Sequence, residues 1–189
     1  MSIKNIIVKD TELSTNRIKQ IKSLVKAISA NPSIHPLRVP AGNHRIIFCV
    51  TDNSRIINIG QFDKYSNVNE RFKTNNPNFS ASYYEIWDKV IGSIQDYRLN
   101  RIYFHLYLSD EDKEYILLHT DPVDDDATHG IYKRSPHLHI KHTNDNIIAH
   151  AHFALNINDY DIAMSSLEEI NKCFENHIDM LSHQILRIK

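Results

Sequence analysis

The chain has 189 residues, of which 41% are hydrophobic and 24% charged, and its formal net charge is −1 with histidine neutral. This length allows one domain with a full hydrophobic core, so we expect residues 1–189 to form a single domain. The balanced charge disfavours a protein that binds nucleic acid mainly through its phosphates. Only four glycines are present, which excludes the Gly-rich phosphate loops of nucleotide-binding folds.

No segment of the chain has the features of a targeting or membrane-spanning sequence. The N-terminus lacks an apolar stretch long enough for a signal peptide, and no later run approaches the length needed to cross a bilayer. The two cysteines, Cys49 and Cys173, lie far apart in apolar stretches, which is typical of core thiols in a reducing compartment. We therefore expect a cytoplasmic protein without membrane association, and the abundance of Ile, Asn and Lys suggests a bacterial source.

The first predicted element is a helix over residues 11–30. Apolar side chains recur there at helical spacing from Leu13 to Ile28, and Asn31-Pro32 ends the pattern. A turn-rich connector follows at residues 34–44.

The next part of the chain has the composition of a β-hairpin. The runs at residues 45–52 and 55–63 are rich in β-branched and aromatic residues, and Asp52-Asn53-Ser54 between them is suited to a turn. Residues 64–80 are polar and Asn-rich, which predicts a long loop.

A second helix is predicted over residues 81–98. Ser82 and Glu85 have the spacing of a capping box, and an apolar stripe follows at helical spacing, made of Trp87, Val90, Ile91, Ile94 and Tyr97.

Apolar runs at residues 101–109 and 114–120 predict central strands, and a long apolar stripe predicts a C-terminal helix over residues 159–187. The expected fold is α+β: a mainly antiparallel sheet within residues 45–156, with three helices packed against it.

Residues 135–155 carry five histidines within sixteen residues, four of them in two His-x-His pairs. On a strand, alternate side chains share a face, so His137 and His139 share one, as do His150 and His152. A turn at residues 143–146 would place His139 opposite His150 and His137 opposite His152, which gathers four imidazoles on one face. A three-residue loop would instead put the two pairs on opposite faces.

Such a cluster has three interpretations. The imidazoles could bind a divalent transition metal such as zinc, iron or nickel, with Asp121 as a further ligand or an orienting carboxylate. They could perform metal-free acid–base chemistry. They could also simply occupy a half-exposed polar face. His105, His119 and His129 are weaker candidates, interpreted as a core imidazole and two solvated loop side chains.

No family motif is complete in this stretch. Histidine-triad hydrolases, for example, carry three alternating histidines, whereas the third positions here are Lys141 and Ala154.

The predicted function is a small bacterial enzyme, most simply a metal-dependent hydrolase of a phosphoester or similar anionic substrate, small molecule or nucleic acid. His137, His139, His150 and His152 would be ligands or acid–base groups, and Arg134 would contact the anion. The alternative is a non-enzymatic binding or regulatory protein, such as a member of a toxin–antitoxin or phage-defence operon, acting with a partner protein. The C-terminal helix, apolar to its last residues, also predicts a homodimer through its distal half.

Overall fold

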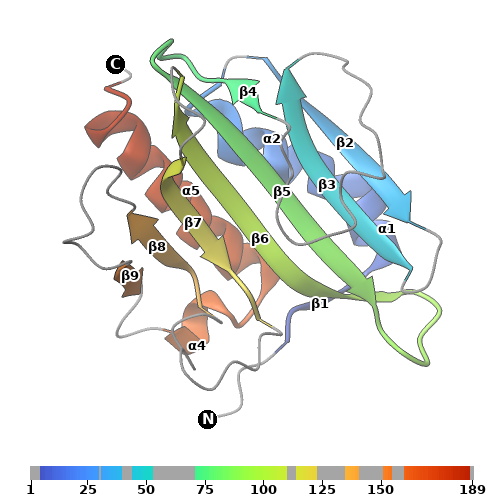
Figure 1. The fold of residues 1–189 in the computed structure, drawn as a ribbon. Helices are drawn as coiled ribbons and strands as arrows, with labels where there is room; N and C mark the ends of the chain where they lie inside the picture. The colour runs from blue at the N-terminus through green and yellow to red at the C-terminus, as the bar shows by residue number, and fades with distance from the viewer. Residues whose placement is uncertain are drawn as a thin grey trace.

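The computed structural model describes residues 5–29, 31–39, 44–52, 71–109, 114–122, 135–140, 151–154 and 160–187. The described residues form one sheet and two helical regions (Figure 1). The strands are β1 (Ile7–Lys9), β2 (Pro32–Val39), β3 (Arg45–Asp52), β4 (Phe72–Lys73), β5 (Phe79–Lys89), β6 (Asp96–Leu108), β7 (Glu114–Thr120), β8 (His137–Ile140) and β9 (Ala151–Ala154).

The sheet has the order β2-β3-β5-β6-β7-β8-β9, with β1 added beside β6 and β4 beside β5. Each of these pairings is antiparallel. The long strands β5 and β6 are central to it. The expectation of an α+β fold with a mainly antiparallel sheet is therefore confirmed.

The helices differ in detail from the three that were expected. The N-terminal helical stretch consists of α1 (Asp10–Glu12), a π-helical segment (Leu13–Arg17) and α2 (Ile18–Lys26), so the helix predicted over 11–30 is present but ends earlier. The C-terminal helix is divided into α4 (Tyr160–Ala163) and α5 (Leu167–Gln184). The division falls where Ser166 caps α5 by accepting a hydrogen bond from the backbone N–H of Glu169.

The helix predicted over residues 81–98 is wrong. This segment contains most of β5, a turn and the start of β6. Its apolar stripe is not a packing face, because Ile91 and Ile94 are 100% and 86% exposed at the turn. The inward-facing positions of β5 are Tyr83, Glu85 and Trp87, which alternate as a strand requires.

Two other predictions concern the neighbours of β3. The connector expected at residues 34–44 is largely strand β2, which pairs with β3 along its whole length. Strand β3 itself has the predicted bounds, but its other edge pairs with β5 over Arg45–Cys49. Residues 55–63, predicted as the hairpin partner of β3, lie outside the described residues.

Helices α2 and α5 lie on the same face of the sheet (Figure 1). Between helices and sheet lies the main core, to which both contribute fully buried side chains such as Ile21, Phe104 and Phe174. The opposite face of the sheet carries a smaller apolar cluster around Ile47, Cys49 and Tyr84. Tyr103 of β6 packs against this smaller cluster.

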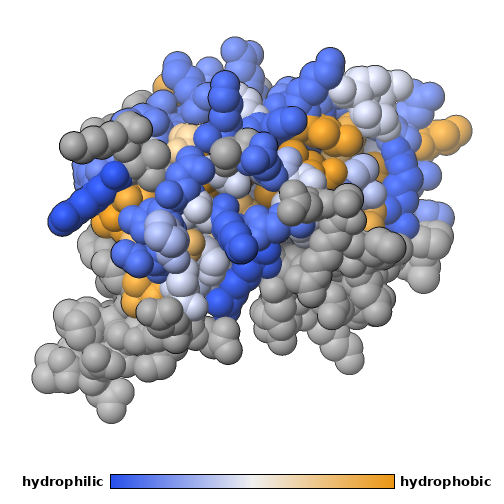
Figure 2. Space-filling model, turned by 90° about the horizontal axis from the view of Figure 1, so that it is seen from above, coloured by the Kyte–Doolittle hydropathy of each residue, from blue (hydrophilic) through white to orange (hydrophobic). Residues whose placement is uncertain are grey.

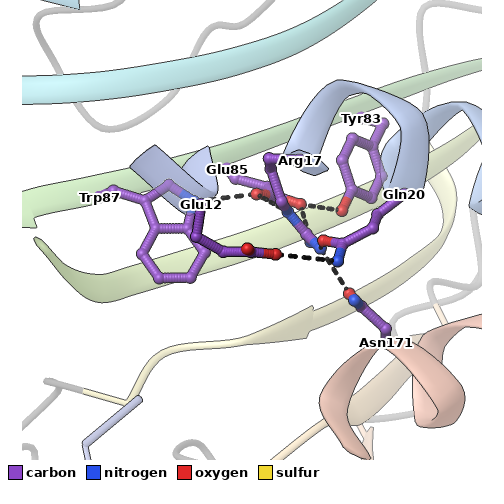
Figure 3. A network of polar contacts seen from close by, with 7 residues as sticks. All are labelled: Glu12, Arg17, Gln20, Tyr83, Glu85, Trp87 and Asn171. Carbon is purple, nitrogen blue, oxygen red and sulfur yellow. Dashed lines mark hydrogen bonds and ion pairs between the residues drawn. The ribbon is translucent and has the colours of Figure 1, made fainter. Parts of the chain in front are cut away.

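A buried polar network ties the N-terminal helical stretch to β5 and α5 (Figure 3). Arg17 and Glu85 are both 0% exposed, and Arg17 donates to Glu85 through Nε at 2.8 Å and through Nη2. Glu85 also accepts from the Tyr83 hydroxyl and from Trp87 Nε1. Asn171 of α5 accepts from Arg17 Nη1 at 2.7 Å. The network therefore holds three distant parts of the chain together.

The apolar stripe of α5 is buried within its own chain. Ile178 is 0% exposed and Leu181 is 2% exposed, and the stripe continues into Leu186, which is 1% exposed. Seen from above, the described surface is largely hydrophilic, with apolar side chains in separated areas (Figure 2). The stripe that motivated the homodimer is thus explained by intramolecular packing, and the homodimer stays a prediction.

None of the described helices is both long and apolar enough to cross a membrane.

Candidate metal centre

Adjacent strands β7 and β8 bring three histidines together on the sheet face opposite the helices. The register pairs His119 of β7 directly with His137 of β8, and Leu117 with His139. Because side chains alternate along a strand, His137 and His139 share the face of His119. The predicted sharing of a face by His137 and His139 follows from this local alternation.

The three imidazoles form a compact, buried group. Their exposed fractions are 4% for His119, 0% for His137 and 5% for His139. Ring centroids lie 4.0 Å apart for His119 and His137, 4.5 Å for His119 and His139, and 4.9 Å for His137 and His139. One ring nitrogen from each residue lies within 4.8 Å of the others, so the group could hold a metal ion.

The Nε2 atoms of His119 and His139 are only 2.6 Å apart. Two nitrogens at this separation cannot both carry hydrogen, so at least one presents its lone pair. With zinc–nitrogen bonds of about 2.0–2.1 Å, tetrahedral geometry would place two ligand nitrogens about 3.4 Å apart. The two rings would therefore separate by less than about 1 Å to accept an ion between them.

Two of the imidazoles are oriented by oxygen atoms behind them. His119 Nδ1 lies 2.9 Å from Asp121 Oδ2, and His137 Nδ1 lies 2.9 Å from the backbone carbonyl oxygen of Ser135. Carboxylate and carbonyl partners of this kind accompany metal-binding histidines, because they fix the tautomer that leaves Nε2 for the metal. The donor set and its surroundings thus fit a nitrogen-ligated transition metal.

Asp121 is itself held in place by neighbours on β6. The Tyr103 hydroxyl donates to both of its carboxylate oxygens, at 3.1 and 2.9 Å, and Arg101 Nε lies 3.9 Å from Oδ1. Burial alone would raise the pKa of Asp121. The contacts with His119, Arg101 and Tyr103 outweigh burial and hold that pKa below its usual value. Asp121 is therefore an anion that faces His119.

No protein-family model matches the chain. No curated protein and no solved structure matches it either.

The predicted site residues have different outcomes. His137 and His139 lie in the cluster, and Asp121 lies beside it as an orienting carboxylate. Arg134 and His150 are outside the described residues. For β9 only the backbone is described, and there residue 152 is opposite His139 while Ala154 is opposite His137.

The predicted register of the hairpin is therefore wrong by two residues. His139 was expected opposite His150, but it pairs with His152. A shift of two keeps the alternation of faces, whereas a shift of one would invert it.

His119 is the ligand candidate that sequence reasoning undervalued. It was expected to be a solvated loop side chain, but it is buried in β7 at the centre of the group. A usable signal was its spacing from Asp121, since His-x-Asp at the end of a strand can place a carboxylate behind an imidazole. His105 lies outside the group and stacks between Tyr103 and Tyr107, at centroid distances of 5.6 and 5.8 Å.

Proposed function

We propose that this protein is a metal-dependent hydrolase of a phosphoester or related anionic substrate. His119, His137 and His139 hold one divalent transition metal ion, with zinc, iron and nickel as candidates for nitrogen ligands. The observation that supports this proposal is the buried group of three imidazoles with ring nitrogens within 4.8 Å of one another.

The described residues supply three candidate ligands, a number that favours a catalytic centre over a purely structural one. Structural zinc sites are normally closed by four protein ligands, whereas catalytic sites have three and keep one position for water or substrate. A metal in such a site lowers the pKa of its bound water and so supplies a nucleophile near neutral pH. In this proposal His152, whose backbone position is opposite His139, takes its predicted alternative role of an acid–base group beside the metal.

The residues around the metal ligands have separate tasks in this proposal. Asp121 and the carbonyl of Ser135 keep two imidazoles oriented. Arg101 is a cation beside the centre, 3.9 Å from Asp121, and is a candidate contact for the anionic group of the substrate. Arg134 keeps the same predicted role.

Metal binding is the first test. We expect protein purified without a histidine tag to take up about one equivalent of Zn²⁺, Ni²⁺ or Fe²⁺ on reconstitution. His137→Ala should abolish this uptake, whereas His105→Ala, a histidine on the same sheet face but outside the group, should retain it. Wild-type uptake below about a tenth of an equivalent would contradict the proposal.

Activity is the second test. The metal-loaded protein should hydrolyse p-nitrophenyl phosphate or bis-p-nitrophenyl phosphate, and a chelator or His137→Ala should remove the activity. If the protein binds metal tightly but hydrolyses neither ester, the proposed hydrolase activity is refuted and only the metal-binding role is retained.

A non-enzymatic role with an operon partner is the second candidate, and one observation favours it. Ile91 and Ile94 are 100% and 86% exposed at the turn between β5 and β6, and exposed apolar side chains at a turn suit a protein contact. If a neighbouring gene encodes the partner, its product should co-purify with the wild type and be lost from Ile91→Ser/Ile94→Ser with metal uptake unchanged. If the partner still co-purifies with the double variant, this surface is not the site of contact.

A further inference from the structure

Tyr103 contacts the candidate metal centre in two ways. Its ring lies against the ring of His119, with centroids 4.5 Å apart and planes tilted by 35°. Its hydroxyl donates to both carboxylate oxygens of Asp121, the residue whose Oδ2 lies 2.9 Å from His119 Nδ1. A single side chain of β6 therefore controls the position of the imidazole and that of its carboxylate.

The position of the Asp121 carboxylate affects which nitrogen of His119 is available to a metal. Asp121 Oδ2 lies 2.9 Å from His119 Nδ1, so it favours the tautomer of His119 that carries its hydrogen on Nδ1. The other nitrogen, Nε2, then presents its lone pair toward His139, where the ion would bind. Without a donor to hold it, the carboxylate could rotate away from Nδ1 and both tautomers would become accessible.

The hydroxyl of Tyr103 is suited to this task because it lies within hydrogen-bond distance of both carboxylate oxygens of Asp121, at 3.1 and 2.9 Å. Arg101 also lies near Asp121, but at 3.9 Å it contributes charge and not a short directional bond. The fixed orientation of Asp121 therefore depends mainly on Tyr103.

We propose that Tyr103 is a positioning residue of the metal centre, which through Asp121 sets the tautomer and orientation of His119. This inference rests on the metal site of the proposed function. Loss of a partner behind a metal-binding histidine typically weakens metal affinity 10–100-fold. Asp121 is that partner and Tyr103 acts one hydrogen bond further out, so we expect Tyr103→Phe to weaken metal binding by about 10-fold, the lower end of this range.

Tyr103→Phe isolates the hydroxyl from the packing of the ring. Phenylalanine retains the contact with His119 and the stacking on Tyr84, whose ring centroid is 5.0 Å away. Tyr107→Phe is the matched control, since Tyr107 lies on the same face of the same strand and stacks on His105. Four residues along a strand separate Tyr107 from Tyr103 by about 13 Å, so its hydroxyl is remote from the centre.

The experiment uses Co²⁺ and Zn²⁺ as probes of the full chain after metal removal. Co²⁺ absorption bands report the geometry of the ligands, and competition with a chelator gives the Kd for Zn²⁺. We expect Tyr103→Phe to weaken Zn²⁺ binding and alter the Co²⁺ spectrum, and Tyr107→Phe to stay within about twofold of the wild type. Circular dichroism and urea unfolding check that each variant folds.

The outcomes separate this inference from the proposed function. If the wild type binds neither ion, the metal site fails and the role of Tyr103 fails with it. If the wild type binds and Tyr103→Phe stays within about twofold with the same Co²⁺ spectrum, only the positioning role is overturned. Should Tyr103→Phe not fold, Asp121→Asn tests the same link, and unchanged affinity in that variant would overturn it.

Discussion

Glu85→Gln should destabilise the protein strongly, because it leaves the charge of Arg17 buried without a counter-ion. Both side chains are 0% exposed, and Glu85 accepts hydrogen bonds from Arg17, Tyr83 and Trp87 (Figure 3). Burial lowers the pKa of Arg17, but the charge of Glu85 outweighs this and holds the pKa above its usual value, so the guanidinium stays charged. A glutamine amide would have one acceptor oxygen in place of two, and its NH₂ group would face another donor.

The expected loss is a large share of the total stability. Removing one partner of a buried ion pair costs about 3–5 kcal/mol, and native domains are stable by about 5–15 kcal/mol. With a urea dependence of about 2 kcal/mol per molar, a loss of about 4 kcal/mol lowers the urea midpoint by about 2 M. The remaining bonds of Arg17 to the amide oxygens of Gln20 and Asn171 do not offset this loss, because neither carries a charge.

The assay is urea unfolding followed by tryptophan fluorescence. Trp87 is the single tryptophan, and its Nε1 donates to Glu85 at 2.9 Å, so it reports on this network directly. Asp10→Asn is the control, since it breaks an ion pair with Arg38 whose side chains are 36% and 54% exposed. That exposed pair should contribute less than about 1 kcal/mol.

The double variant Arg17→Met/Glu85→Gln distinguishes loss of charge pairing from loss of packing. Methionine removes the buried charge, so the double variant should be at least about 2 kcal/mol more stable than the sum of the two single losses predicts. A Glu85→Gln midpoint no lower than that of Asp10→Asn, or strictly additive single losses, would refute the reasoning.

Three further predictions use the same urea assay. Gly92 has a φ of +82°, and a Cβ at this position would meet no atom within 4 Å, so Gly92→Ala should cost roughly 1–2 kcal/mol from backbone strain alone, and Gly92→Asn less. Ser166→Ala should lower the stability by about 1 kcal/mol, because it removes the cap of α5. Ser166→Asp should retain most of that stability, because aspartate is also a good cap. The hydrogen bond from Arg38 holds the pKa of Asp10 below its usual value, so this pair contributes stability at neutral pH that is lost as the pH falls below about 4. The difference between the wild type and Asp10→Asn should therefore shrink between pH 6 and pH 3, and a growing difference would contradict this sign.

Elements set by local pattern could be predicted well from the sequence. Strands β3 and β7 have the predicted bounds, because each is a short apolar run between polar turns. The N-terminal helical stretch also follows from its periodicity, with Leu13, Ile21 and Val25 all buried in the core. In these segments the local preference and the tertiary environment agree.

The segment at residues 81–98 could not be predicted, because its decisive partner is distant. The spacing of Ser82 and Glu85 predicts a capping box, yet Glu85 is the counter-ion of Arg17, 68 residues earlier in the chain. Once Glu85 faces the core, Tyr83 and Trp87 do so too, and the segment must be a strand. A local sequence pattern cannot predict this ion pair, because its two residues are far apart in the chain.

Two factors bring the three histidines together: the alternation of side chains within one strand, and the pairing of that strand with its neighbour. His137 and His139 share a face because of alternation within β8, which depends on nearby residues only. The third imidazole comes from β7, and its place opposite His137 depends on the register between the two strands, which no local pattern specifies. The hairpin pattern pointed instead to β9, since that strand carries the second His-x-His pair. Because β8 lies between β7 and β9, both neighbours are adjacent to its histidines, and the pairing with β7 is what brings His119 and its carboxylate Asp121 to the centre.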